Sequence, residues 1–309
     1  MPACPCRRAR GVACIDASAG PAIASLRDAQ AADLGAGGGR AADVFMMQDR
    51  AIIGLARWLK TPAGRYLLGW EQGEVDRAVA DIFGFHALQL GLPELETLRA
   101  NRMPHRWIAL DATAERPAAG SPAAAAALLR CDFEALPIDS QSIDLIVMPH
   151  TLELAHDAHL ALREAERVLR PEGRLVIVGF NPHSLWGARQ WLGHLRQRLT
   201  RGAPRPLYLP SEGEFIAYRR LRDWLRLLSF EVEGGRFGCY RPPFTSERGL
   251  TRFGWMERAG DRWWPVFGAV YFVVAVKRVR GMRLVGLVKQ PTAHPIAAPA
   301  AVANHREAA

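Results

Sequence analysis

The sequence of 309 residues is poor in cysteine. It has five, of which Cys4, Cys6 and Cys14 lie near the start, whereas Cys131 and Cys239 stand alone among apolar residues. Such a distribution provides no disulfide framework. It favours a reducing compartment, so we predict a cytoplasmic protein. The short Cys-x-Cys at the start does not make a zinc-binding pattern, and we predict no metal site.

A hydrophobic segment long enough to cross a membrane is also missing. The longest apolar run, WWPVFGAVYFVVAVK, ends at Lys277. A membrane-spanning helix needs roughly 20 such residues. We therefore predict no transmembrane helix, and we interpret this run as a loop followed by a buried strand. The start of the chain likewise lacks the continuous apolar core of a signal peptide.

Lysine is nearly absent, so arginine supplies almost all of the positive charge behind a formal net charge of +9. This excess favours anionic partners or substrates but does not indicate a fold. The arginines are densest between residues 196 and 226, on two amphipathic segments. We interpret them mainly as a solvated helix face, with a basic cover over an anionic substrate as the alternative.

Sustained apolar periodicity is absent from both ends of the chain. Residues 1–45 are rich in alanine and glycine, and the final residues are rich in alanine and proline. We expect a disordered leader over 1–45 and a disordered tail over 283–309. Met46 or Met47 is an alternative start. Residues 46–282 then form one domain, in which residues 186–228 make a helical insertion or lid.

Helical periodicity begins directly after the leader. Residues 50–60 place their large apolar side chains on one helical face. Thr61 and Pro62 then fit the N-cap and the first position of a second helix, which we expect to continue to about Phe83.

After Gly84 short apolar runs alternate with crossover segments, in the order HALQLG, RWIALD, ALLRCDF, IDLIVMPH and RLVIVGF. Continuous apolar strands joined by crossovers predict a mostly parallel sheet with helices on both faces. FEVEGGRFGCY and VYFVVAV add two late strands, which fit an antiparallel hairpin at the edge of that sheet. The fold class is therefore α/β.

The helix between IDLIVMPH and RLVIVGF has the clearest signals. Asp157 can cap its start, and Pro171 with Gly173 can end it. The side chains expected to face the sheet are Leu160, Val168 and Leu169.

Candidate site residues follow four of the predicted strands, because ligands of open parallel sheets bind outside the carboxyl ends of the strands. They are Gly91, Asp111, Asp132 with Phe133, and His150. Asp111 lies about twenty residues after Gly91, the spacing of an acid that binds ribose hydroxyls. Asp132 and Phe133 suit an adenine, since a carboxylate accepts from its amino group and an aromatic ring packs on it. His150 faces whatever lies beside the cofactor.

The glycine-rich loop of dinucleotide-binding folds is missing after the first of these strands. HALQLGLPEL has one glycine, and two of the expected glycines are absent. Dinucleotide sites need backbone amides near the pyrophosphate, and Pro93 removes one. We place Glu94 and Glu96 in the first turn of a following helix, where they would repel a phosphate. A nicotinamide cofactor is therefore disfavoured.

The segments LRCDFEALPIDSQSIDLIVMPHTLEL and ALREAERVLRPEGRLVIVGFNP resemble the core of the class I S-adenosylmethionine-dependent methyltransferases. The similarity is to the group related to the ubiquinone/menaquinone C-methyltransferases, and in particular to a YafS-like branch. It covers about residues 50–280 and is strongest from Cys131 to Pro182. The resemblance implies a Rossmann-like fold with a mostly parallel seven-stranded sheet, an antiparallel last strand and helices on both faces.

The resemblance also implies S-adenosylmethionine as the cofactor and a role for each strand-end residue. Gly91 matches the first glycine of the cofactor loop, Asp111 the ribose acid, and Asp132 with Phe133 the adenine site. Gln89 stands where the family carries an acid, and Pro93 and Leu95 replace the later glycines of its cofactor loop. S-adenosylmethionine has no phosphate, so acidic residues near the loop are tolerated.

The implied function is methyl transfer to an unidentified acceptor, for which the arginines favour an anionic one. Transfer needs mainly in-line alignment, with His150 as the base if the acceptor must lose a proton. One alternative is a binding or regulatory protein that kept the fold without turnover, motivated by Gln89, Pro93 and Leu95. Another is an RNA-binding module that uses the arginines, which we favour less.

Overall fold

The structure, a computed structural model, describes residues 54–111, 127–199, 207–210, 213 and 215–278. The expectations for the leader and for the tail lie outside these ranges. Within the described helices none is long and apolar enough to cross a membrane.

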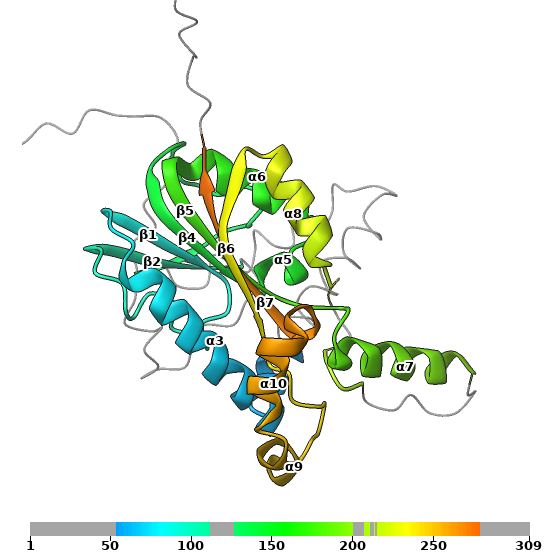
Figure 1. The fold of residues 1–309 in the computed structure, drawn as a ribbon. Helices are drawn as coiled ribbons and strands as arrows, with labels where there is room; N and C mark the ends of the chain where they lie inside the picture. The colour runs from blue at the N-terminus through cyan, green and yellow to red at the C-terminus, as the bar shows by residue number, and fades with distance from the viewer. Residues whose placement is uncertain (1–53, 112–126, 200–206, 211–212, 214, 279–309) are drawn as a thin grey trace, which may run out of the picture. The chain divides into compact units, whose positions relative to one another are not determined.

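Seven strands form one mixed sheet in the order β3-β2-β1-β4-β5-β7-β6 (Figure 1). Their bounds are β1 His86–Leu90, β2 His105–Leu110, β3 Ala127–Arg130, β4 Ile143–Pro149, β5 Leu169–Phe180, β6 Phe230–Gly238 and β7 Val270–Lys277. The neighbours from β3 to β5 are parallel, whereas β7 runs antiparallel to both β5 and β6. The predicted mostly parallel sheet, its antiparallel last strand and the late hairpin at its edge are confirmed.

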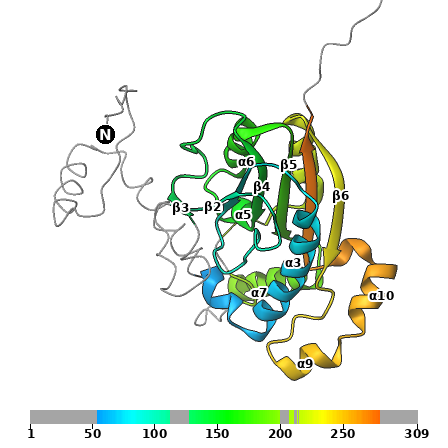
Figure 2. The ribbon, with the colours of Figure 1, turned by 90° about the vertical axis from the view of Figure 1, so that its left-hand side faces the viewer.

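Successive residues of the central strands face opposite sides of the sheet, as the period of a strand requires. On β1, Ala87 belongs to one hydrophobic core, whereas Leu88 and Leu90 belong to the other. The helix α3, Pro62–Ala80, contributes to the first core. The helices α6, Ala158–Val168, and α8, Tyr218–Leu227, contribute to the second. Figures 1 and 2 show α3 on one face and α6 with α8 on the other, which confirms helices on both faces.

The predicted start of α3 is confirmed. Thr61 is its N-cap, where the side-chain oxygen accepts a hydrogen bond from the backbone N–H of Gly64 at 3.2 Å, and Pro62 is its first residue. The helix ends at Ala80, three residues before the expected end at Phe83. Residues 54–59 form a preceding helical segment, also as predicted.

The helix α6 begins at the predicted residue, but the side chains that it packs against the sheet differ from the predicted ones. Asp157 caps it by accepting hydrogen bonds from the backbone N–H groups of His159 and Leu160. The expectation that Leu160 faces the sheet is wrong, because its side chain is exposed. Leu162, two positions later, is buried in its place. The helix ends at Val168 because the backbone from Leu169 onward is already paired as β5.

Residues 186–228 do not form one insertion. α8 packs against the sheet through Leu221 and Leu225 and is therefore part of the core. α7, Leu185–Leu199, is the part that leaves the sheet directly after β5 (Figure 1). The remaining helices are α5 Thr151–Leu154, α9 Glu247–Arg252, α10 Met256–Trp263 and the short η1 Pro265–Phe267.

Candidate functional site

The carboxyl ends of four adjacent parallel strands meet at one edge of the sheet. Gly91 follows β1, Asp111 follows β2, Asp132 lies shortly after β3, and His150 follows β4. Backbone hydrogen bonds between neighbouring chain segments hold the first residues after the strands in register. The N–H of Gly91 donates to the carbonyl of Ala109 at 2.7 Å, and the residue after β3 donates in the same way to β2. The structure therefore brings the predicted site residues to one edge.

Gly91 is the point where three of these loops come closest. Its backbone has φ +76, a conformation that residues with a side chain rarely adopt. A methyl group in place of its hydrogen would lie 3.5 Å from Thr151 Oγ1 and 3.6 Å from the ring of Phe133. Thr151, which the sequence analysis did not single out, also donates its hydroxyl to the carbonyl of Leu90 at 2.5 Å. Its only sequence signal is a hydroxyl one position beyond a strand end.

Gln89 organises the loop after β1. Its side-chain Nε2 donates to the carbonyls of Gly91, Leu92 and Leu95 at 2.8–3.0 Å. Its Oε1 accepts from both the hydroxyl and the N–H of Thr97, at 2.6 and 3.3 Å. A carboxylate at this position could accept from Thr97 but could not donate to three carbonyls. The amide is thus matched to the fold of this loop.

No helix follows β1: residues 91–104 contain only turns and extended backbone. The placement of Glu94 and Glu96 in a first helical turn is therefore wrong. The carbonyls of Leu92 and Leu95 accept from the Gln89 amide and also from the backbone N–H groups of Leu95 and Thr97, which is a pattern of short turns. The buried side chains of Leu92 and Leu95 hold the loop against the hydrophobic core.

The two aspartates differ in burial. Asp111 is only 7% exposed at the end of β2, whereas Asp132 is exposed. A side-chain oxygen of Asp132 accepts from the N–H of Glu134 at 2.9 Å, which fixes the turn after β3. Phe133 is buried and packs in the core that α6 covers. Its ring thus lies between that core and Gly91.

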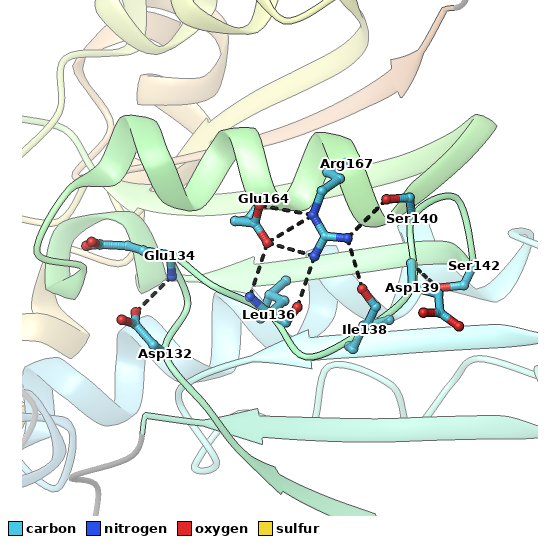
Figure 3. A network of polar contacts seen from close by, with 9 residues as sticks. All are labelled: Asp132, Glu134, Leu136, Ile138, Asp139, Ser140, Ser142, Glu164 and Arg167. Atoms are coloured by element: carbon cyan, nitrogen blue, oxygen red, sulfur yellow. Dashed lines mark hydrogen bonds and ion pairs between the residues drawn. The ribbon is translucent and has the colours of Figure 1, made fainter. Parts of the chain in front are cut away.

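Arg167 on α6 holds the rest of the loop that carries Asp132 (Figure 3). Its guanidinium donates to the carbonyl of Leu136 at 2.9 Å, to the carbonyl of Ile138 at 3.0 Å and to the hydroxyl of Ser140 at 3.1 Å. The carboxylate of Glu164, one helical turn earlier, binds Arg167 and accepts from the N–H of Leu136. These contacts position the turn after β3, and nothing in the sequence pattern distinguished Arg167 from a solvated arginine.

His150 is completely buried and turns away from the loops around Gly91. Its backbone is left-handed, with φ 52, and its N–H donates to the carbonyl of Val178 at 2.8 Å. Its Nδ1 lies 2.8 Å from Glu153 Oε2, and its Nε2 lies 2.8 Å from Glu71 Oε1. Glu71 belongs to α3, so this network joins α3 to the end of β4.

The electrostatics of this network argue against the predicted role of His150 as a base. Burial lowers the pKa of His150, but the carboxylates of Glu71 and Glu153 outweigh it and raise this pKa to about 10. Burial also raises the pKa of Glu153, although its contact with His150 opposes this rise. A histidine with both ring nitrogens bonded to carboxylates has no lone pair to offer a substrate. In this structure Thr151, not His150, is the side chain after β4 that lies near Gly91.

Across the part of the chain that the structure describes, no group of three or more His, Cys, Asp or Glu side chains is arranged to hold a metal ion. The residues that directly follow the four strands include two carboxylates and no lysine or arginine. They are Gly91 after β1, Asp111 after β2, residues 131–133 after β3, and residues 150–151 after β4. Such an edge suits a cationic ligand better than a phosphate.

Comparison with known proteins finds a family model that matches part of the chain and relatives that are similar in sequence. The family model described as a methyltransferase domain matches residues 93–177. One relative is the uncharacterized protein YafS of Escherichia coli strain K12, 31% identical over 176 residues, which are 57% of this chain and 65% of that protein. Another is the ubiquinone/menaquinone biosynthesis C-methyltransferase UbiE of Cellvibrio japonicus, 39% identical over 59 residues. Those residues are 19% of this chain and 24% of that protein.

The chain thus spans just under two thirds of the length of YafS and about a quarter of that of UbiE. Among solved structures, an S-adenosylmethionine-dependent methyltransferase of Thermotoga maritima is similar with a TM-score of 0.46 and 15% identity. That similarity covers 76% of this chain and 100% of the other. The matched family model thus shows that residues 93–177 of this chain are similar to a methyltransferase domain.

Proposed function

We propose that the chain binds S-adenosylmethionine and transfers its methyl group to an acceptor that is still to be identified. The observation that carries the proposal is the meeting of Gly91, Asp111, Phe133 and Thr151 at the carboxyl edge of β1 to β4. Ligands of open α/β sheets bind at this edge. The family of residues 93–177 supports the choice of cofactor.

The residues at this edge fit the chemistry of that cofactor. The carboxylate of Asp111 can accept hydrogen bonds from the two hydroxyls of a ribose, and its small exposed fraction would make such bonds strong. Asp132 and Asp111 add negative charge, which favours the sulfonium and ammonium groups of S-adenosylmethionine. The missing side chain of Gly91 leaves the backbone approachable between Phe133 and Thr151.

When bound, the cofactor would supply a methyl group activated by an adjacent sulfonium. The chain's own contribution would be alignment: Asp111 holds the ribose, Asp132 lies on the adenine side, and Thr151 borders the acceptor side. Orientation of this kind lowers a barrier by several kcal/mol without acid or base help. His150 would then act as a positioning residue that fixes the end of β4 against α3.

For the acceptor we propose an anionic molecule, and for the protein a cytoplasmic location. The excess of arginine supports the first, including Arg219 and Arg220, which are exposed at the start of α8. The low cysteine content supports the second.

A second function is a methyltransferase fold that binds the cofactor or another ligand without turnover. It is favoured by the loop after β1, in which Leu92 and Leu95 are buried and only Gly91 is a glycine. An RNA-binding module, the third reading, rests on charge alone and predicts binding that weakens steeply with salt.

Calorimetric titration of the full chain with S-adenosylmethionine and with S-adenosylhomocysteine tests the proposal. We expect saturable binding of both at one site. The absence of heat with both compounds would overturn the assignment of the cofactor. Binding of both, without formation of S-adenosylhomocysteine when aqueous and lipid fractions of cells are added as acceptors, would favour the fold without turnover.

A further inference from the structure

Large apolar side chains are exposed in two segments that border the carboxyl edge of the sheet. We name these side chains the apolar rim. They are Leu185, Trp191, Leu192 and Leu199 on α7, and Trp255, Trp263, Trp264, Val266 and Phe267 from residue 255 to η1, with exposed fractions between 42% and 75%. Exposed apolar side chains gathered in this way indicate an interaction surface.

The two segments are tied together. The side-chain amide of Asn181, at the end of β5, donates to the carbonyls of Val266 and Gly268 at 2.8 and 2.9 Å. Trp186, at the start of α7, donates its indole N–H to the carbonyl of Arg241 at 2.8 Å. Figures 1 and 2 show α7, α9 and α10 at the same end of the sheet. The rim is therefore one feature of the fold, beside the proposed cofactor edge.

α7 has the pattern of a helix that lies on a lipid surface. Leu185, Leu192 and Leu199 are seven residues apart and thus share one side of the helix. All three are exposed. The helix contains no aspartate or glutamate, and its charged side chains are Arg189, Arg196 and Arg198. Tryptophan and leucine beside arginine are typical of helices that lie in the interface of anionic membranes.

The second segment repeats this chemistry in a loop. Every residue from 261 to 267, DRWWPVF, is exposed, although four of the seven are large and apolar. The acids of α10 have arginines nearby: Glu257 lies 3.7 Å from Arg241, and Asp261 lies 3.6 Å from Arg236. Counting residues 185–199 and 241–267 together gives eight arginines and three acids, a formal charge of 8 − 3 = +5.

We propose that the apolar rim docks this protein onto the surface of a bilayer that contains anionic phospholipids. The exposed tryptophan and leucine side chains can be buried in the membrane interface. The positive charge around them is attracted to the anionic headgroups. No described helix can span the bilayer, so the contact is peripheral. Docking would place the cofactor edge next to the lipid. The inference concerns the surface and stands independently of methyl transfer.

Co-sedimentation of the full chain with vesicles tests the proposal. Vesicles of phosphatidylcholine with about 30% phosphatidylglycerol should bind the protein at least about tenfold more tightly than phosphatidylcholine alone, and added salt should weaken this binding. The variant Trp263→Ser/Trp264→Ser/Phe267→Ser should lose about tenfold or more of that affinity. The matched control is Phe83→Ser/Phe85→Ser, because these rings are 73% and 64% exposed but lie before β1, at the opposite edge of the sheet.

Three outcomes would overturn the proposal. The first is no binding to either kind of vesicle, and the second is equal loss in the control variant. The third is a wild-type dimer that the triple serine variant converts to a monomer while vesicle binding stays absent, since a second copy would then cover the rim. Far-ultraviolet circular dichroism and the melting temperature of each variant show whether a loss of binding reflects unfolding.

Discussion

The imidazole Nε2 of His150 lies 2.8 Å from a carboxylate oxygen of Glu71, which is 79 positions earlier in the sequence. Both side chains are fully buried. The other oxygen of Glu71 is buried without a hydrogen-bond partner. This contact connects α3 to the end of β4, and it would leave a charged group in the core if one partner were removed.

We predict that Glu71→Gln destabilises the protein strongly. Removing one member of a buried, hydrogen-bonded ion pair costs up to roughly 3–5 kcal/mol, and His150 would keep only the carboxylate of Glu153 as a charged partner. Urea unfolding at neutral pH measures the change. The control is Glu231→Gln, whose side chain is 66% exposed in its pair with Arg278. Equal and small losses in the two variants would show that the buried pair contributes no more than a surface pair.

We predict that the stability of the protein falls as the pH rises from neutral to alkaline. The pKa of His150 is raised from 6.5 to about 10 in the fold, so the folded state binds this proton more tightly than the unfolded chain. The stabilisation is therefore complete below the unfolded value and is lost as the pH approaches about 10. His150→Gln should flatten this part of the curve. Parallel curves for wild type and variant, from urea midpoints across this range, would contradict the prediction.

We predict that Gln89→Glu destabilises the loop after β1. At neutral pH a carboxylate would face the carbonyls of Gly91, Leu92 and Leu95 with no hydrogen to donate. Leaving a buried acceptor without a hydrogen-bond partner costs about 1–3 kcal/mol of folding stability. The melting temperature should drop at pH 7 and recover partly in acid, where the new side chain is protonated. Gln141→Glu, on the exposed turn before β4, is the control and should change little.

We predict that Asp111→Asn weakens the binding of S-adenosylmethionine more than Asp132→Asn does. A hydrogen bond to a charged group is worth about 1.5–3 kcal/mol, and Asp111 is the more buried of the two carboxylates. Calorimetry on each variant gives the affinity. Asp139→Asn, at an exposed position of the loop in Figure 3, controls for the loss of one negative charge. If all three variants bind equally well, the ribose assignment is wrong.

The strands and the helix starts could be predicted from the sequence because their signals are local. Residues 175–180, LVIVGF, are apolar throughout since this part of β5 is buried on both faces. Thr61 and Asp157 cap helices through bonds to residues two or three positions away. The strand ends that carry Gly91 and Asp111 followed from the same reasoning.

The contacts that shape the site could not be predicted, because they join distant residues. No pattern on α3 shows that Glu71 points into the core while its neighbours reach solvent. The Gln89 amide bonds to Gly91, Leu92, Leu95 and Thr97, and no local pattern shows that the loop folds back onto β1 to make these contacts. Leu160 and Leu162 are equally apolar, so the choice between them was set by the exact rotation of α6.

The position of β7 between β5 and β6 has a consequence for the order in which the chain can assemble. β6 is made before β7 during synthesis, yet among the strands that the structure describes β6 pairs with β7 alone. Residues 230–238 therefore lack their partner strand until residues 270–277 have left the ribosome. The edge of β5 that pairs with β7 also stays unpaired until then. Until then, any stalled or truncated chain exposes the open edge of β5 and the whole unpaired segment of β6, the kind of surface on which nascent proteins aggregate.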